Sequence, residues 1–95
     1  MDENYVNYGA LDNAASVYSQ QSEKVGEALT SLLNLIGALE PEWRNNTARA
    51  FFERFNSEYK PVLTNCIEVL GASSEYLVKY KNMTMENDSS SAANL

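Results

Sequence analysis

The sequence predicts an all-α protein, an antiparallel helical hairpin, from two rows of apolar residues and the turn that separates them. Both rows advance by four and three residues in alternation, the spacing that keeps side chains on one side of a helix. One row spans residues 11–39 and the other spans residues 48–80. Two helices joined by a turn as short as residues 40–46 pack side by side in opposite directions.

The members of the two rows are mostly aliphatic and aromatic. The first row comprises Leu11, Ala15, Tyr18, Ser22, Val25, Leu29, Leu32, Ile36 and Leu39. The second row comprises Ala48, Phe52, Phe55, Tyr59, Val62, Cys66, Val69, Ser73, Tyr76 and Tyr80. We expect these two rows to form the seam of the hairpin or of a dimer of hairpins.

The ends of the helices follow from the residues that interrupt the rows. We expect the first helix over residues 10–39, ended by Pro41, because the residue before a proline is pushed out of the helical region. The second helix is expected over residues 47–81. Asn46 or Thr47 is expected to cap it, since either side chain can accept a hydrogen bond from an unpaired backbone N–H group.

Pro61 lies inside the second helix, where it removes a backbone hydrogen bond and clashes with the preceding turn. A kinked continuous helix and a break after Tyr59 are both compatible with it. We favour the kink, because the second row keeps its spacing from Tyr59 through Val62 to Cys66. The place of Cys66 on this row favours a buried, unreactive thiol.

The chain has the size of one domain. Residues 1–81 hold both helices, and the polar, serine-rich residues 82–95 are predicted to be a flexible tail. No stretch approaches the about 18 consecutive apolar residues of a membrane span. The acidic start of the chain also lacks the order of a secretory signal peptide, so export would use a route that accepts an unprocessed chain.

Composition excludes several classes of function. A net charge of -6 argues against nucleic acid or an anionic membrane surface as a partner. The chain has no histidine, which removes the commonest general acid or base and a common metal ligand. Its carboxylates, serines and glycines show no catalytic, metal-binding or phosphate-binding pattern. We therefore expect no enzymatic activity, no metal and no cofactor.

The apolar residues are more numerous than a two-helix hairpin can bury. Those that widen the two rows are Ala28, Leu33, Leu35, Phe51, Leu63, Leu70 and Leu77. A core this small supplies no more than about 3–5 kcal/mol, and a long exposed apolar patch marks a protein–protein surface. We therefore expect two hairpins to dock as a four-helix bundle dimer, the partner being the chain itself or a paralogous hairpin. A self-sufficient three-helix monomer is the alternative.

The turn carries a recognisable pattern. Trp43, Arg44 and Asn45 lie between the helices, and Ala48 and spaced phenylalanines follow. Together with the chain length and the two flanking helices, this stretch resembles the WXG family, the small ESAT-like proteins of type VII (ESX-type) secretion systems. Asn45 replaces the glycine of the family's Trp-x-Gly. Asparagine adopts a positive φ more readily than most residues, so we expect it to serve the turn as glycine would.

A second departure concerns the end of the second helix. Many family members carry Tyr-x-x-x-Asp/Glu there as a secretion signal, whereas here Tyr76 is followed by Tyr80, and Tyr80 by Thr84. The absent motif is compatible with a paralogous partner that supplies the signal or with a diverged signal in the tail. It is also compatible with an intracellular helical chaperone or targeting partner for a larger secreted toxin.

The resemblance implies a protein that acts by recognition, as a substrate or adaptor of the secretion system. It implies secretion without a cleaved signal peptide, with residence in the cytoplasm before export, and a secretion ATPase as a partner. Trp43 then has two interpretations. It packs across the end of the hairpin and fixes the angle between the helices, or it is a docking point in a groove shared with the partner's C-terminal residues.

Overall fold

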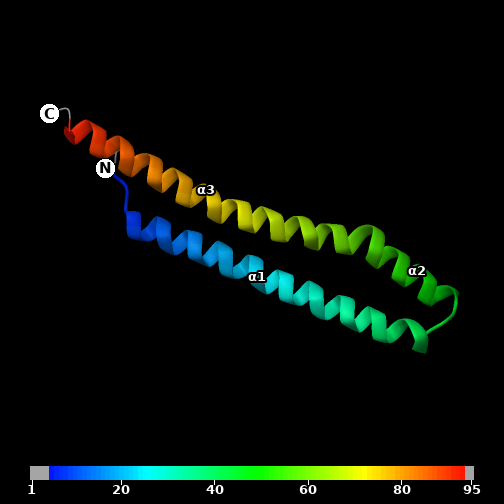
Figure 1. Cartoon of the computed structure of the whole chain (residues 1–95). Coiled ribbons are helices and arrows are strands. Elements are labelled where there is room, and N and C mark those ends of the chain that lie inside the picture. Colours follow the sequence, from blue (N-terminus) through cyan, green and yellow to red (C-terminus); the bar gives the residue numbers. More distant parts are fainter. Residues whose placement is uncertain (1–4, 94–95) are drawn as a thin grey trace.

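The computed structural model describes the backbone of residues 5–93 and the side chains of residues 5–87 as a hairpin with two helical arms (Figure 1). Helix α1 (Tyr8–Leu39) forms the first arm, and the 3₁₀ turn η1 (Glu40–Glu42) follows it. Helix α2 (Asn46–Arg54), the π-helical turn η2 (Phe55–Tyr59) and helix α3 (Lys60–Ala93) form the second arm.

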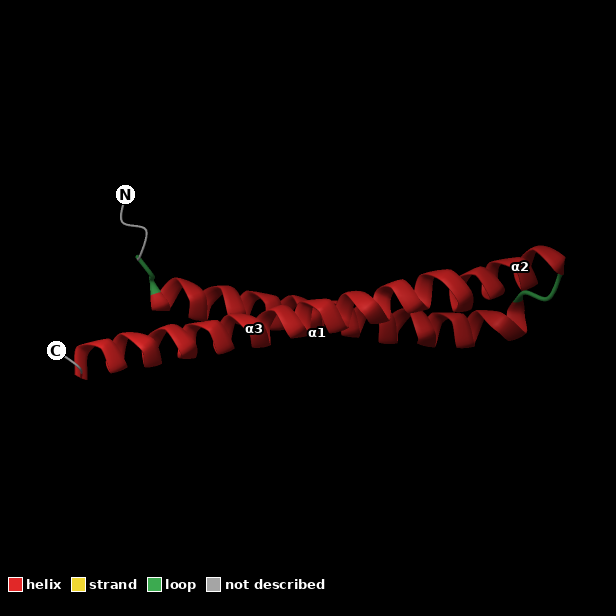
Figure 2. Ribbon diagram, turned by 90° about the horizontal axis from the view of Figure 1, so that it is seen from above, coloured by secondary structure: helices red, strands yellow, loops and turns green. Residues whose placement is uncertain are grey.

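The hairpin is a rod two helices wide. Its extents are 74 × 23 × 17 Å, and the arms cross at a shallow inclination when seen from above (Figure 2). No strand occurs among residues 5–93. The prediction of an all-α antiparallel hairpin is therefore confirmed for the part of the chain that the structure describes.

Helix α1 begins and ends at residues with a clear physical role. The side chain of the N-cap residue Asn7 accepts a hydrogen bond from the backbone N–H of Ala10 at 3.0 Å. This cap starts the helix at Tyr8, slightly before the expected residue 10. The helix ends at Leu39, as predicted, with Pro41 in the turn that follows.

Helix α2 is capped by Asn45, not by Asn46 or Thr47. The Asn45 backbone is extended (φ −144°, ψ −177°), and its Oδ1 accepts a hydrogen bond from the Ala48 N–H at 2.8 Å. An extended residue just before a helix can reach that N–H with a short side chain, which is the usual role of an N-cap. Two expectations are therefore wrong: the position of the cap, and a left-handed turn at Asn45. No non-glycine residue in the described range has a positive φ.

The second arm passes Pro61 without a break in its helical backbone, since α2, η2 and α3 follow one another directly. Directly before Pro61 the backbone forms the π-helical turn η2, in which the Lys60 N–H donates to the Phe55 carbonyl five residues earlier. Pro61 has no N–H, and its ring clashes with the preceding turn of a regular α-helix. The wider turn lies directly before it and accommodates it.

The π-helical turn changes which residues of α3 face α1. It adds one residue to the helical turn, so every later side chain is displaced by one position. The half-buried residues that recur at helical spacing along α3 are Leu63, Ile67, Leu70, Ser74, Leu77, Lys81 and Thr84. We call them the contact row. The expectation that the second row keeps its phase across Pro61 is therefore wrong.

The second row consequently divides at the π-helical turn. Ala48 and Phe55 are buried and Phe52 is half-buried, as the hairpin seam requires. Beyond Phe55, most of the row is exposed to solvent. Its exposed members are Tyr59, Val62, Cys66, Val69, Tyr76 and Tyr80. The buried thiol predicted for Cys66 is wrong in the single hairpin.

The first row faces the second arm at most positions. Ala15 and Ile36 are buried, and the residues at 11, 22, 25, 29 and 39 are half-buried. Tyr18 and Leu32 are 41% and 38% exposed, because they lie at the edge of the seam. Among the side chains that the structure describes, only Ala15, Ile36, Ala48 and Phe55 are buried.

Helix α3 continues to Ala93, past the end near residue 81 that the pattern predicted. Residues 82–93 contain no glycine or proline that would interrupt a helix, so the backbone remains helical after the apolar pattern weakens. Residues 94–95 of the predicted tail lie outside the described residues, as do residues 1–4 of the predicted domain.

Candidate protein-interaction site

An aromatic cluster lies at the turn. The ring centroid of Trp43 is 5.6 Å from that of Phe51 and 5.8 Å from that of Phe52. The two phenylalanine rings are themselves 5.7 Å apart, at a steep angle that favours edge-to-face contact. Trp43 has an extended backbone and is half-buried. Its ring contacts are therefore with α2, and they hold the turn against the start of the second arm.

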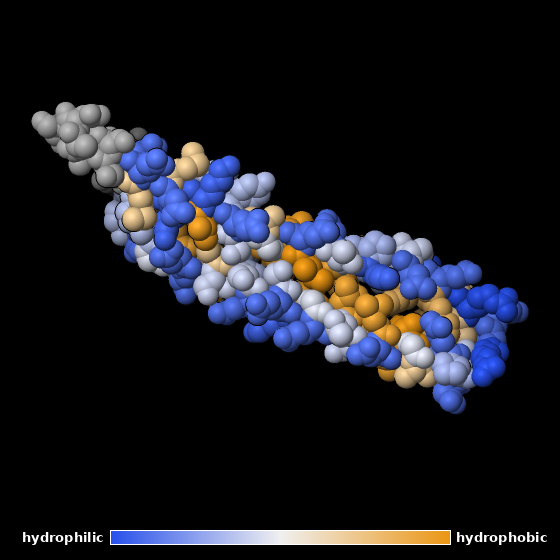
Figure 3. All heavy atoms as spheres, viewed as in Figure 1, coloured by the Kyte–Doolittle hydropathy of each residue, from blue (hydrophilic) through white to orange (hydrophobic). Residues whose placement is uncertain are grey.

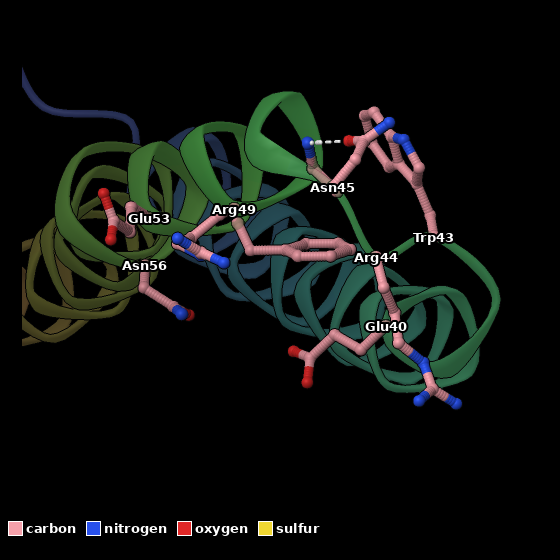
Figure 4. Close-up of a pocket in the computed structure, with 9 residues that line it drawn as sticks. Glu40, Trp43, Arg44, Asn45, Arg49, Glu53 and Asn56 are labelled. Carbon is pink, nitrogen blue, oxygen red and sulfur yellow. Dashed lines mark hydrogen bonds between the residues drawn. The ribbon is translucent and has the colours of Figure 1, made fainter.

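A shallow hollow of about 380 Å³ opens beside this cluster (Figure 4). It is lined by Glu40, Trp43, Arg44, Asn45, Ala48, Arg49, Phe52, Glu53 and Asn56. The hollow thus brings together the three turn residues singled out from the sequence, with apolar groups between charged ones.

The two arginines of the hollow have different surroundings. The Arg44 Nε donates to the Pro41 carbonyl at 2.9 Å, which ties this side chain to the turn. The Arg49 side chain extends along α2 toward Glu53 and Asn56, and the two guanidinium groups point away from each other (Figure 4). The rim of the hollow therefore offers separate positive and negative groups to a polar partner, without one concentrated charge.

A second candidate surface is formed by the exposed part of the second row and by neighbouring residues of α1. We call it the outer face. Its members are Tyr18, Leu32, Leu35, Tyr59, Val62, Cys66, Val69, Tyr76 and Tyr80, all of them exposed. Tyr76 and Tyr80 stack on each other with ring centroids 6.1 Å apart.

These residues share one side of the hairpin. On α3 the outer-face residues directly precede members of the contact row, as Val62 precedes Leu63. On α1, Tyr18 follows the buried residue Ala15 by three positions. A residue one position before the contact row of α3 and a residue three positions after a buried residue of α1 are both rotated in the same sense away from the seam. Because the two helices are antiparallel and right-handed, these residues lie on the same side of the hairpin.

The distribution of polarity around the hairpin is uneven. In the view of Figure 3, hydrophilic side chains border a hydrophobic band that lies between the arms and broadens toward the turn. Away from the turn the arms are held by polar contacts. Ser22 Oγ donates to the Ile67 carbonyl at 2.9 Å, and Ser74 Oγ donates to the Ala15 carbonyl at 2.7 Å.

The contact row was not predicted from the sequence as the set of residues that faces α1. In the sequence pattern, Leu63, Leu70 and Leu77 only widen the second row. Their signal was present, because residues 63, 67, 70, 74 and 77 repeat the same spacing one position later. The proline two residues before this series marks where the two rows exchange roles.

The residues that the structure describes contain no group of three or more carboxylates or thiols placed to hold a metal ion. No helix in that part of the chain is long and apolar enough to cross a membrane.

The chain was compared with family models, curated proteins and solved structures. No family model matches the chain, and no solved structure matches it. An uncharacterized protein of Clostridium acetobutylicum is 24% identical over 82 residues, which cover 86% of this chain and 84% of that protein. The chain is therefore similar in sequence to a protein of comparable length.

Proposed function

We propose that this chain is a small protein of a type VII (ESX-type) secretion system that acts by protein–protein recognition, as an exported substrate or as an adaptor. The proposal includes membership of the WXG family, supported by the resemblance at Trp43–Phe55 and by the helical hairpin on both sides of it.

The observation that carries the proposal is the exposure of the outer face on a hairpin with a thin core. Val62 is 67% exposed, and Val69, Tyr76 and Tyr80 are each more than half exposed. A contiguous apolar surface of this kind is typical of a partner interface. Docking of a second hairpin as a four-helix bundle would remove these side chains from water.

The hollow at the turn is the proposed contact for the secretion machinery. It places an aromatic ring and charged groups at one end of a rod, where a larger protein has access. In this proposal a secretion ATPase reads the turn, and the chain is exported without a cleaved signal peptide.

The alternative is an intracellular helical chaperone or targeting partner for a larger toxin. The sequence that follows Tyr76 and Tyr80 favours this alternative, because neither tyrosine is followed by an acidic residue at the spacing of the secretion signal. In that case helices of the toxin would cover the outer face.

Export of the untagged chain tests the proposal. We expect the protein in the culture medium of the source organism, and we expect it to be lost from the medium when the secretion ATPase gene is deleted. Retention inside cells in both strains would reject the substrate role, and co-purification with a toxin would then favour the alternative.

The Trp43→Ala variant tests the role of the turn. Export is expected to fall at least about tenfold, an effect of the size that loss of one interface aromatic produces. Phe51→Ala is the matched control, because it removes one ring from the same cluster and leaves Trp43 in place. If both variants lower export in proportion to the stability they lose, Trp43 is structural only.

A further inference from the structure

The π-helical turn η2 lies where the second arm can change the face that it turns toward α1. We propose that η2 and Pro61 hold α3 in one of two rotational states that this chain can adopt. In the state that the structure shows, the contact row faces α1. In the other, which we call the rotated state, η2 is a regular α-helical turn. α3 is then rotated about its axis by about 100°, the angle of one residue in a helix.

α3 carries a second set of residues that can face α1. Loss of the extra residue in η2 moves every position of α3 by one place, so each contact-row residue is replaced by the residue directly before it. The residues that exchange places are similar in character, because each pair is either apolar or a pair of serines. The pairs are Val62 and Leu63, Cys66 and Ile67, Val69 and Leu70, Ser73 and Ser74, and Tyr76 and Leu77.

The hydrogen bonds between the arms can be replaced as well. Ser74 Oγ donates to the Ala15 carbonyl at 2.7 Å, whereas Ser73 Oγ donates at 2.8 Å to the carbonyl of Val69 in its own helix. In the rotated state Ser73 takes the place of Ser74 and brings the same hydroxyl group to the opposite arm. The other bond, from Ser22, ends on a backbone carbonyl, which any residue in that place supplies.

Helix α2 has no such alternative, and this is why α3 is the part that turns. If α3 stayed in place and α2 turned instead, each residue of α2 would give its place to the residue that follows it. The buried residues Ala48 and Phe55 would then be replaced by Arg49 and Asn56. Burial of an unpaired charge or amide is costly, so α2 stays as it is.

Two features favour the state that the structure shows. Pro61 has no N–H, and its ring clashes with the preceding turn of a regular α-helix, so it disfavours the rotated state. Lys81 Nζ lies 2.7 Å from Asp12 Oδ1, and Tyr80 would take the place of this lysine without replacing the ion pair. Removal of the proline should increase the population of the rotated state about 100-fold, the factor that corresponds to about 3 kcal/mol.

The test is a disulfide bond that forms in the rotated state. A Cβ added at Gly26 would lie 4.0 Å from Ile67 Cδ1, and in the rotated state Cys66 takes the place of Ile67. In the state that the structure shows, Cys66 is exposed on the outer face. The Gly26→Cys variant should therefore form its disulfide within one chain slowly. Addition of Pro61→Ala should raise that rate about 100-fold under the same oxidant. A non-reducing gel separates this product from links between two chains.

Pro41→Ala is the matched control for loss of a proline. Pro41 lies in η1, outside the second arm, so its replacement should leave the rate of the Gly26→Cys variant unchanged. The geometry has its own control. The Gly26→Cys/Ile67→Cys variant, with Cys66→Ser, should form its disulfide rapidly while Pro61 is present.

Deletion of Ser57 tests whether the extra residue is the cause. Ser57 is exposed, and its hydroxyl donates to Glu53 within the second arm. Its deletion from the Gly26→Cys/Pro61→Ala variant removes one residue before α3, so Ile67 should face position 26 again and the rate should return to its low value. A general loosening of the hairpin would leave the rate high.

Two outcomes would overturn the proposal: equal rates with and without Pro61, or a rate that stays high after deletion of Ser57. The rates are measured on the purified chain, so the result does not depend on the proposed role in secretion.

Discussion

The two halves of the hairpin are held together by different means. In the half that holds the turn, Ile36, Ala48 and Phe55 are buried, and the ring of Trp43 contacts those of Phe51 and Phe52. Toward the termini the only fully buried side chain among the described residues is Ala15, the leucines at 11, 70 and 77 are half-buried, and hydrogen bonds also join the arms. Stability is therefore expected to reside mainly in the turn half, because burial of large apolar side chains is the dominant favourable contribution.

The terminal half has a different task. A Cβ added at Gly71 would lie 3.6 Å from Ser22 Oγ, which shows how closely the arms approach there. In the same half, Lys81 Nζ lies 2.7 Å from Asp12 Oδ1. The serine hydroxyls bond to carbonyls on the opposite arm, which fixes the arms in one alignment. We expect burial near the turn to supply most of the free energy of folding, and hydrogen bonds near the termini to specify the register.

The largest effect should come from the turn half. Phe55→Ala removes a ring that is 5% exposed and should lower the free energy of unfolding by about 3–5 kcal/mol. Urea denaturation at one fixed protein concentration measures this loss. Phe51→Ala, at a ring that is 43% exposed, should cost clearly less. Equal losses of unfolding free energy in the two variants would show that Phe55 contributes no more to the core than Phe51.

A smaller effect is expected at the start of the second arm. Asn45→Ala removes the cap of α2 and should cost about 1 kcal/mol, whereas Asn45→Asp should retain the stability, because aspartate caps equally well. Asn46→Ala is the control and should be close to neutral. Thermal unfolding of the three variants measures the differences. A loss at Asn46 larger than that at Asn45 would restore the original prediction of the cap.

Single substitutions in the half near the termini should lower the free energy of unfolding least. Ser22→Ala and Ser74→Ala each remove one hydrogen bond between the arms and should cost about 0.5–1.5 kcal/mol. The control is Ser73→Ala, because Ser73 bonds to Val69 within its own helix. Chemical denaturation measures the losses, and spin labels on both arms report the register. If Ser73→Ala costs as much as Ser74→Ala, the bonds between the arms do not set the alignment.

Much of the fold was predictable from the sequence because local signals agreed with tertiary packing. The alternating spacing of the first row, the end of α1 before Pro41 and the all-helical hairpin follow from such signals. Of the candidate site, the sequence identified Trp43 and its neighbours, which the hollow brings together.

The residues of the second arm that face α1 could not be predicted, because they depend on how the helix accommodates Pro61. Residues 59, 62, 66 and 69 and residues 63, 67, 70 and 74 both fit the helical period. Periodicity alone therefore cannot say which series faces α1. A regular helix places the first series inward, and the π-helical turn places the second there. A related ambiguity affects Asn45, because the sequence allows both a cap and a left-handed turn and only the backbone geometry distinguishes them.

The extra residue in η2 has a consequence for how such hairpins diversify. Insertion of one residue into a helix rotates everything after it by about 100° relative to the preceding segment. A related hairpin that lost the widened turn would present Leu63, Ile67 and Leu70 outward with almost no change in composition. The surface that such a hairpin presents to a partner can therefore shift through one peptide unit at the start of that surface.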